Sequence, residues 1–121
     1  MRLSEELRQR TKRFASAVIR LYVKLPRRRP EVDVLARQLL RSGTSVGANY
    51  RAACRGRSSA DVVATLSIVE EEADESIYWM ELLVEGAIVK QSRVEAMKKE
   101  ANELLAMTVA SIKTLRARNR Q

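Results

Sequence analysis

Apolar side chains recur at alternating four- and three-residue intervals along most of the chain, and this spacing is the strongest constraint on its fold. The first such series is Leu7, Thr11, Phe14, Val18, Leu21 and Leu25. Spacing of this kind lines up one apolar stripe along a helix, where it faces other helices. The alternation of β-branched and aromatic residues that marks strands is missing, and only 4% of the residues are aromatic. The sequence therefore predicts an all-α protein.

Helix-breaking and helix-capping residues divide this pattern into four segments. Pro26 and Pro30 separate the first two, because proline stops the preceding helix and suits the first turn of the next. Gly56 and Ser58–Asp61 separate the second from the third, and the capping box Ser92–Glu95 begins the fourth. We predict helices at about residues 5–24, 30–55, 60–89 and 93–117, packed as an antiparallel up-down four-helix bundle that forms one domain over residues 1–121.

The second and third segments are predicted to pack against each other. Gly43 and Gly47 lie one turn apart among other small residues, so a neighbouring helix can come close. Neither a preceding strand nor a following Gly-Lys-Ser/Thr accompanies them, which argues against a phosphate-binding loop. Five residues are assigned structural roles: Ser42 and Ser45 keep the helix surface thin, and Asn49, Glu72 and Trp79 tie the second helix to the third. Asn49 is expected in the buried seam, where one amide can fix the register.

Charge is strongly segregated along this basic chain, whose formal net charge is +8. Residues 1–30 contain ten Lys/Arg and two Asp/Glu, whereas residues 61–90 contain one and eight. Clustered cations neutralise phosphates on many different folds, and without a base-reading motif any binding is led by charge and shape. Nucleic-acid contacts are predicted for Arg13, Arg20, Lys24, Arg27, Arg28, Arg29, Arg51 and Arg55. The alternative is a protein–protein interaction scaffold whose acidic third helix docks a basic partner.

The sequence offers little for catalysis. The chain has no histidine, which is the commonest general base and metal ligand. Cys54 therefore has no histidine to activate it and is interpreted as a small buried residue. Two Glu-x-x-Glu pairs, Glu72 with Glu75 and Glu100 with Glu103, leave a magnesium-dependent all-α nucleotide pyrophosphohydrolase as a lower-ranked alternative. We predict a non-enzyme without a cofactor or a metal site.

The compartment is expected to be the cytoplasm. A single cysteine allows no intramolecular disulfide, which suits a reducing environment. No apolar run is long enough to cross a membrane, and the first residues lack the apolar core of a signal peptide.

Two motifs in the middle of the chain resemble a known protein family. One is Ser42–Ala53 (Ser-Gly-Thr-Ser-Val-Gly-Ala-Asn-Tyr-Arg-Ala-Ala), and the other is Glu71–Leu83, with Asp61 between them. At this spacing they resemble the four-helix-bundle proteins of the 23S rRNA intervening-sequence family, which are similar to the accessory variability determinant protein of diversity-generating retroelements. The resemblance implies a homopentameric ring, a basic surface that contacts nucleic acid, and no enzymatic activity. In the retroelement branch it also implies association with a reverse transcriptase and its RNA.

Overall fold

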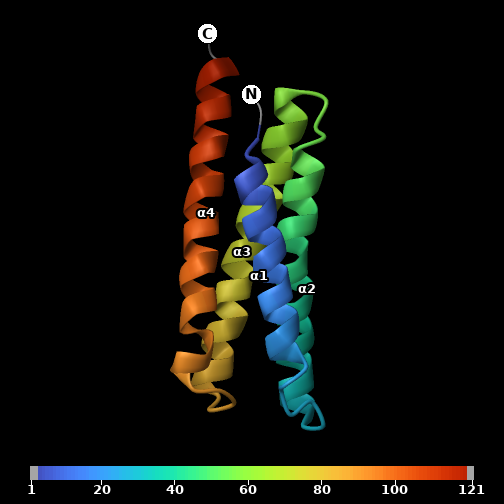
Figure 1. Cartoon of the computed structure of the whole chain (residues 1–121), viewed down its shortest axis with the longest axis vertical. Helices are drawn as coiled ribbons and strands as arrows, with labels where there is room; N and C mark the ends of the chain where they lie inside the picture. The colour runs from blue at the N-terminus through green and yellow to red at the C-terminus, as the bar shows by residue number, and fades with distance from the viewer. Residues whose placement is uncertain (1–2, 120–121) are drawn as a thin grey trace.

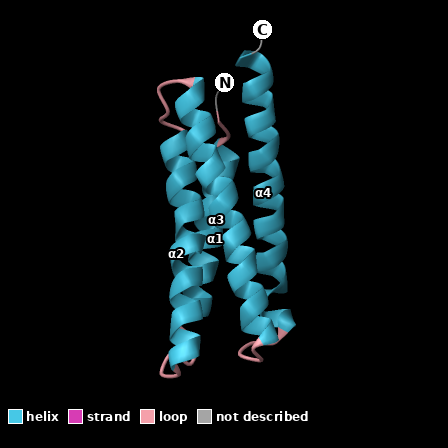
Figure 2. Ribbon diagram, turned by 180° about the vertical axis from the view of Figure 1, so that it is seen from behind, coloured by secondary structure: helices cyan, strands magenta, loops and turns pink. Residues whose placement is uncertain are grey.

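The computed structural model describes residues 3–119 and contains four long helices joined by short loops. These are α1 (Glu5–Tyr22), α2 (Pro30–Ala53), α3 (Ser59–Glu85) and α4 (Gln91–Asn119). The helices run alternately up and down, so the first and last described residues lie at the same end of the molecule (Figure 1). Figure 2 shows the same four helices from behind, with loops only at the two ends of the bundle. The predicted all-α, up-down four-helix architecture is confirmed.

Capping residues account for the helix starts. The Ser4 hydroxyl accepts a hydrogen bond from the backbone N–H of Leu7 at 3.1 Å, and the Ser58 hydroxyl accepts one from Asp61 at 3.1 Å. Pro30 is the first residue of α2, where its fixed φ suits the helix. Helices α1 and α2 each end two residues before the predicted position, and α4 is two residues longer than predicted at each end. Such differences are normal for terminal turns.

The end of α3 differs more from the prediction, because the helix stops at Glu85 and not near residue 89. Ala87 has a φ of 58°, in the left-handed region. The N–H of Ile88 donates to the carbonyl of Leu83 at 3.0 Å, and the N–H of Ala87 donates to that of Val84 at 3.0 Å. This pair of hydrogen bonds is a Schellman motif with alanine at the position where glycine is usual.

The core is a column of mainly aliphatic side chains contributed by all four helices. All six residues of the first predicted stripe are buried, five of them on α1 and Leu25 in the loop that follows it. On α2 the predicted stripe is displaced, because Tyr50 is buried and Asn49 is only half-buried. The prediction that the Asn49 amide fixes the register between helices is therefore wrong, since its Nδ2 donates to the Ser45 carbonyl of the same helix at 2.9 Å.

Tyr50 takes the position that was expected for Asn49. Its side chain is one of the largest fully buried groups of the core, and its hydroxyl accepts a hydrogen bond from the backbone N–H of Ser4 at 3.1 Å. The end of α2 is thereby joined to the start of α1. Burial raises the pKa of the Tyr50 hydroxyl, mainly because it disfavours the charged form.

The two glycines of α2 were expected to bring this helix close to α3, but they bring it close to α1. A Cβ atom on Gly43 would lie 2.8 Å from Cγ2 of Val18, and one on Gly47 would lie 3.2 Å from the Thr11 carbonyl oxygen. Any larger residue at these positions would push the helices apart. The small-residue run therefore sets the α1–α2 distance.

Candidate nucleic-acid interface

The α2–α3 interface is held by polar contacts that use several of the predicted structural residues. Arg41 of α2 forms ion pairs with both Glu72 and Glu75 of α3. Trp79 Nε1 donates to Glu75 Oε1 at 3.1 Å, which orients that carboxylate toward the arginine. Although desolvation opposes the shift, these hydrogen bonds and charges raise the pKa of Arg41. Arg41 and Glu75 were not among the predicted structural residues, although an arginine on the helix beside the acidic α3 was a usable signal.

Two serines complete the same interface inside the core. Ser76 of α3 donates its hydroxyl to Ser42 of α2 at 3.0 Å, and both side chains are fully buried. Ser42 in turn donates to the Leu39 carbonyl at 3.3 Å. Because every buried hydroxyl among residues 3–119 has a partner, these small polar residues allow close packing without an unsatisfied group.

A second arginine joins α1 to α4. Arg10 Nη2 lies 2.6 Å from Glu100 Oε1, and Arg10 Nε donates to Glu100 Oε2 at 3.0 Å, which is a bidentate pair. Glu103 lies 3.4 Å from the same Nη2 atom. Hydrogen bonding of the Arg10 guanidinium to the Glu100 carboxylate is the largest cause that raises the pKa of Arg10. Arg10 and Arg41 therefore have structural roles between helices.

These ion pairs divide the four glutamates that a magnesium site would need. Glu72 and Glu75 face Arg41, whereas Glu100 and Glu103 face Arg10. Within residues 3–119, no three Asp, Glu, Cys or His side chains lie close enough together to hold a metal ion. The geometry therefore provides no metal cage of the kind that the pyrophosphohydrolase alternative requires.

Cys54 is exposed just after α2, so its interpretation as a buried residue is wrong. Partial desolvation of its thiol raises the pKa, which leaves it less nucleophilic than an ordinary cysteine at neutral pH.

All eight cations predicted to contact nucleic acid are exposed, but the structure does not bring them together. Arg13, Arg20 and Lys24 follow α1 toward the α1–α2 loop, which contains residues 27–29, whereas Arg51 and Arg55 lie at the opposite end of the bundle (Figure 1). Ion-pair partners within the described chain are absent for Arg13, Arg20, Lys24, Arg27, Arg28, Arg51 and Arg55.

Two of the loop arginines have local partners. Arg29 Nε lies 2.7 Å from Glu31 Oε1, and this hydrogen bond contributes to a lowered pKa of Glu31, second to a backbone hydrogen bond. Arg27 Nη1 donates to the Tyr22 hydroxyl at 3.1 Å, and its guanidinium carbon lies 4.3 Å from the centroid of the Tyr22 ring. The cation–π contact directs the Arg27 side chain back along the end of α1.

A shallow groove between α1 and the start of α4 is lined by two of the predicted cations. Arg20 and Lys24 line this groove of about 190 Å³ together with Arg93, and no carboxylate lines it. Its apolar floor consists of Ala17, Leu21 and Met97. A second groove of about 200 Å³ adjoins it, shares part of this floor and is lined by Arg13 and Glu100. Arg93 was not among the predicted contacts, because only the fold shows that the start of α4 lies beside the end of α1.

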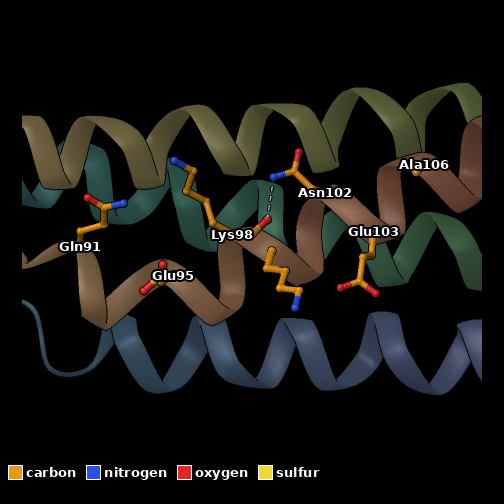
Figure 3. Close-up of a pocket in the computed structure, with 7 residues that line it drawn as sticks. Gln91, Glu95, Lys98, Asn102, Glu103 and Ala106 are labelled. Atoms are coloured by element: carbon orange, nitrogen blue, oxygen red, sulfur yellow. Dashed lines mark hydrogen bonds between the residues drawn. The ribbon is translucent and has the colours of Figure 1, made fainter.

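A wide hollow along α4 has a different character. It has a volume of about 660 Å³ and is formed by side chains of α4 alone (Figure 3). Glu95 and Glu103 share it with two lysines, and Asn102 donates to the Lys98 carbonyl at 3.1 Å. Lys98 also pairs with Glu81 of α3 at 3.6 Å. Mixed charge of this kind gives a phosphate no clear advantage, in contrast to the α1–α4 groove.

No helix among residues 3–119 combines the length and the apolar character needed to cross a membrane.

Comparison with known proteins relates the whole bundle to earlier structures. The family described as "23S rRNA-intervening sequence protein" matches residues 5–110 of the chain. A crystal structure of a protein of unknown function from the S23 ribosomal protein family of Bacteroides thetaiotaomicron is 33% identical in sequence and superposes with a TM-score of 0.82. The match covers 88% of this chain and 98% of that one. No curated protein sequence matches the chain.

Proposed function

This chain belongs to the 23S rRNA-intervening sequence protein family, and we propose that it is a non-catalytic, oligomeric helical-bundle protein that binds the backbone of nucleic acid. The binding surface is the exposed side of α1 that faces α4, together with the α1–α2 loop. Localisation in the cytoplasm, where nucleic acid is available, is part of the proposal.

The distribution of paired and unpaired cations carries this proposal. The two arginines that lie between helices, Arg10 and Arg41, each hold two carboxylates. In contrast, Arg20, Lys24 and Arg93 share one groove without a carboxylate. Charges of one sign in a shared groove raise the local potential for an anion. Binding a polyanion there releases the counterions of its phosphates, which favours association at low salt.

Self-association into a homopentameric ring is the second part of the proposal. Its support is the family resemblance and the charge of α3, where Glu71, Asp74 and Glu85 are exposed. The acidic α3 can lie against a basic surface of the next copy, and such a head-to-tail contact closes into a ring when the angle between copies allows it. A reverse transcriptase is a further proposed partner, which rests on the family resemblance alone.

One observation favours a competing proposal, a protein–protein interaction scaffold without nucleic-acid binding. Tyr78 is 51% exposed on acidic α3 and packs edge-on against Trp79, with ring centroids 5.0 Å apart. Exposed aromatic side chains with a fixed orientation are typical of protein interfaces. A basic protein partner on α3 would then replace nucleic acid on α1.

A salt series separates the two proposals. Binding of the full chain to a structured RNA and to duplex DNA is measured by fluorescence anisotropy, and the mass in solution is recorded on the same samples. The slope of log K against log salt should be about −0.9 per phosphate neutralised. Arg20→Glu with Arg28→Glu should flatten this slope by about two units, which corresponds to roughly 60-fold weaker binding near 0.1 M salt.

The matched control is Lys113→Glu with Arg116→Glu, which changes the charge equally at exposed positions of α4. This control should lose much less affinity than the α1 variant. Equal losses in both variants would mean that binding follows net charge and not the proposed surface. An intact oligomer that binds neither nucleic acid at low salt would overturn the nucleic-acid proposal in favour of the scaffold.

A further inference from the structure

A second cationic groove lies on the side of α1 that faces α2. It has a volume of about 300 Å³, and its walls carry Arg8 and Lys12 from α1 and Arg51 from α2. No carboxylate is among its lining residues. We propose that this groove is a binding site for one phosphate-bearing group, supplied either by a nucleic-acid backbone or by a free nucleotide.

The floor of the groove is open because the residues beneath it are small. Ala15, Gly47 and Ala48 form this floor. The two helices touch at this level, since a Cβ atom on Gly47 would lie only 3.2 Å from a backbone carbonyl of α1. The long cationic side chains therefore stand on either side of a shallow hollow that no side chain of the protein fills. Its volume is at the lower limit for small-molecule sites, which suits a nucleotide or a short piece of backbone.

The hydrogen-bonding groups around the groove can be accounted for one by one. Lys12 and Arg51 have no ion pair with any residue from 3 to 119. Arg8 lies 3.4 Å from Glu5, but the two side chains are 37% and 68% exposed, and such a pair contributes little to stability. The Thr44 hydroxyl gives its proton to backbone carbonyls of its own helix, so it does not donate to a ligand. The available donors are therefore all cationic except for one amide.

That amide belongs to Gln9, which now donates to Glu5 at 3.0 Å. Arginine offers a planar fork that matches two phosphate oxygens, and lysine acts as a point charge. Arg8 and Arg51 come from different helices, so an anion between them is held from two sides. A phosphate that displaces Glu5 from Arg8 would gain three cations in exchange for one exposed ion pair.

This inference deepens the proposed function and rests on it only for the nucleic-acid origin of the phosphate. The groove along α4 and the groove along α2 lie on the two flanks of α1, with Lys24 lining the first and Lys12 the second. A nucleic-acid strand that binds in the groove along α4 could then place one of its phosphates in the groove along α2.

The test uses the full chain in its native assembly and three probes: pyrophosphate, AMP and a short single-stranded RNA. The amide signals of Gly47 and Ala48 are followed by transverse relaxation-optimised NMR spectroscopy. Affinities are measured by isothermal titration calorimetry. We expect saturable shifts of both amides with pyrophosphate. Lys12→Gln with Arg51→Gln should weaken this binding about tenfold or more, whereas Arg20→Gln with Lys24→Gln should change it less than about twofold.

A second variant keeps the test decisive if the first one folds poorly. Ala48→Glu places a carboxylate on the floor at an exposed helical position and should abolish pyrophosphate binding. Unsaturable shifts of equal size at all cationic segments would overturn the proposed site. RNA affinity that is lost in the Arg20/Lys24 variant but unchanged in the Lys12/Arg51 variant would overturn it as well, while leaving the proposed function intact. Saturable pyrophosphate or AMP binding without any RNA binding would support the site and overturn the nucleic-acid function.

Discussion

Replacing Gly43 by alanine tests the close contact between α1 and α2, because the added methyl group has no free space. Its Cβ would lie 2.8 Å from Val18 Cγ2, whereas an ordinary contact begins at 3.4 Å. Val18 is completely buried and has no exposed position to move into. Overpacking of a core costs about 1–3 kcal/mol, and the helix propensity of alanine offsets about 1 kcal/mol. We expect Gly43→Ala to lower the free energy of unfolding by about 1 kcal/mol.

Shortening Val18 to alanine should reverse the sign of the effect of Gly43→Ala on stability. Val18→Ala alone removes two buried methyl groups and leaves a cavity, at a cost of about 2–3 kcal/mol. In that background, Gly43→Ala no longer clashes, fills part of the cavity and gains about 1 kcal/mol of helix propensity. The double variant should therefore be about 2 kcal/mol more stable than the two separate effects predict.

Urea unfolding followed by circular dichroism measures these differences, at one fixed protein concentration because assembly shifts the apparent stability. Ala48→Gly is the matched control, since Ala48 is exposed on the same helix and reports the alanine–glycine difference, which should be about 1 kcal/mol. The reasoning is refuted if Gly43→Ala stabilises the protein by the full control difference and shows no coupling to Val18. The helices would then not touch at Gly43.

Two further substitutions test other parts of the fold. Ala87→Gly should stabilise the protein by about 1 kcal/mol, because glycine adopts a φ of 58° without steric cost; an unchanged urea midpoint would contradict the described end of α3. Burial raises the pKa of Tyr50 above its ordinary value of 10.0. The contribution of Tyr50 to the free energy of unfolding is therefore complete below pH 10 and is lost as the pH rises through the higher folded-state pKa. Tyr50→Phe should remove this loss of stability at alkaline pH. At neutral pH it should cost about 1 kcal/mol, because the hydrogen bond from the Ser4 N–H is lost. Equal stability–pH curves for the two proteins would contradict this prediction.

The helix pattern was predictable where the spacing was unambiguous. Every position of the first stripe is apolar or small and polar, and all six are buried, five on α1 and Leu25 just after it. On α2, Asn49 and Tyr50 lie three and four residues after Val46, so spacing alone allows either one to face the core. Tyr50 is the one that faces the core, and its partner, the Ser4 N–H, lies 46 residues away and meets it only in the folded bundle.

The candidate site was predictable as a set of exposed cations but not as a surface. Helical spacing places Arg20, Lys24 and Arg51 away from the core, as observed. It does not show that Arg51 shares a groove with Lys12 or that Arg20 shares one with Arg93. Grooves depend on which helices are neighbours and how closely they approach, and these distances depend on small residues whose packing partners are far away in sequence.

The sparse contact between α1 and α4 also has a consequence for the order in which the bundle assembles. Each helix packs chiefly on the helix that follows it, so most contacts close short loops, a topology typical of rapid folding. The α1–α4 contact instead joins residues far apart, with Arg10 and Glu100 separated by 90 positions. We therefore expect that contact to close after the rate-limiting step, so weakening it should speed unfolding while leaving the folding rate nearly unchanged. Unfolding of the bundle would then begin with separation of α1 from α4.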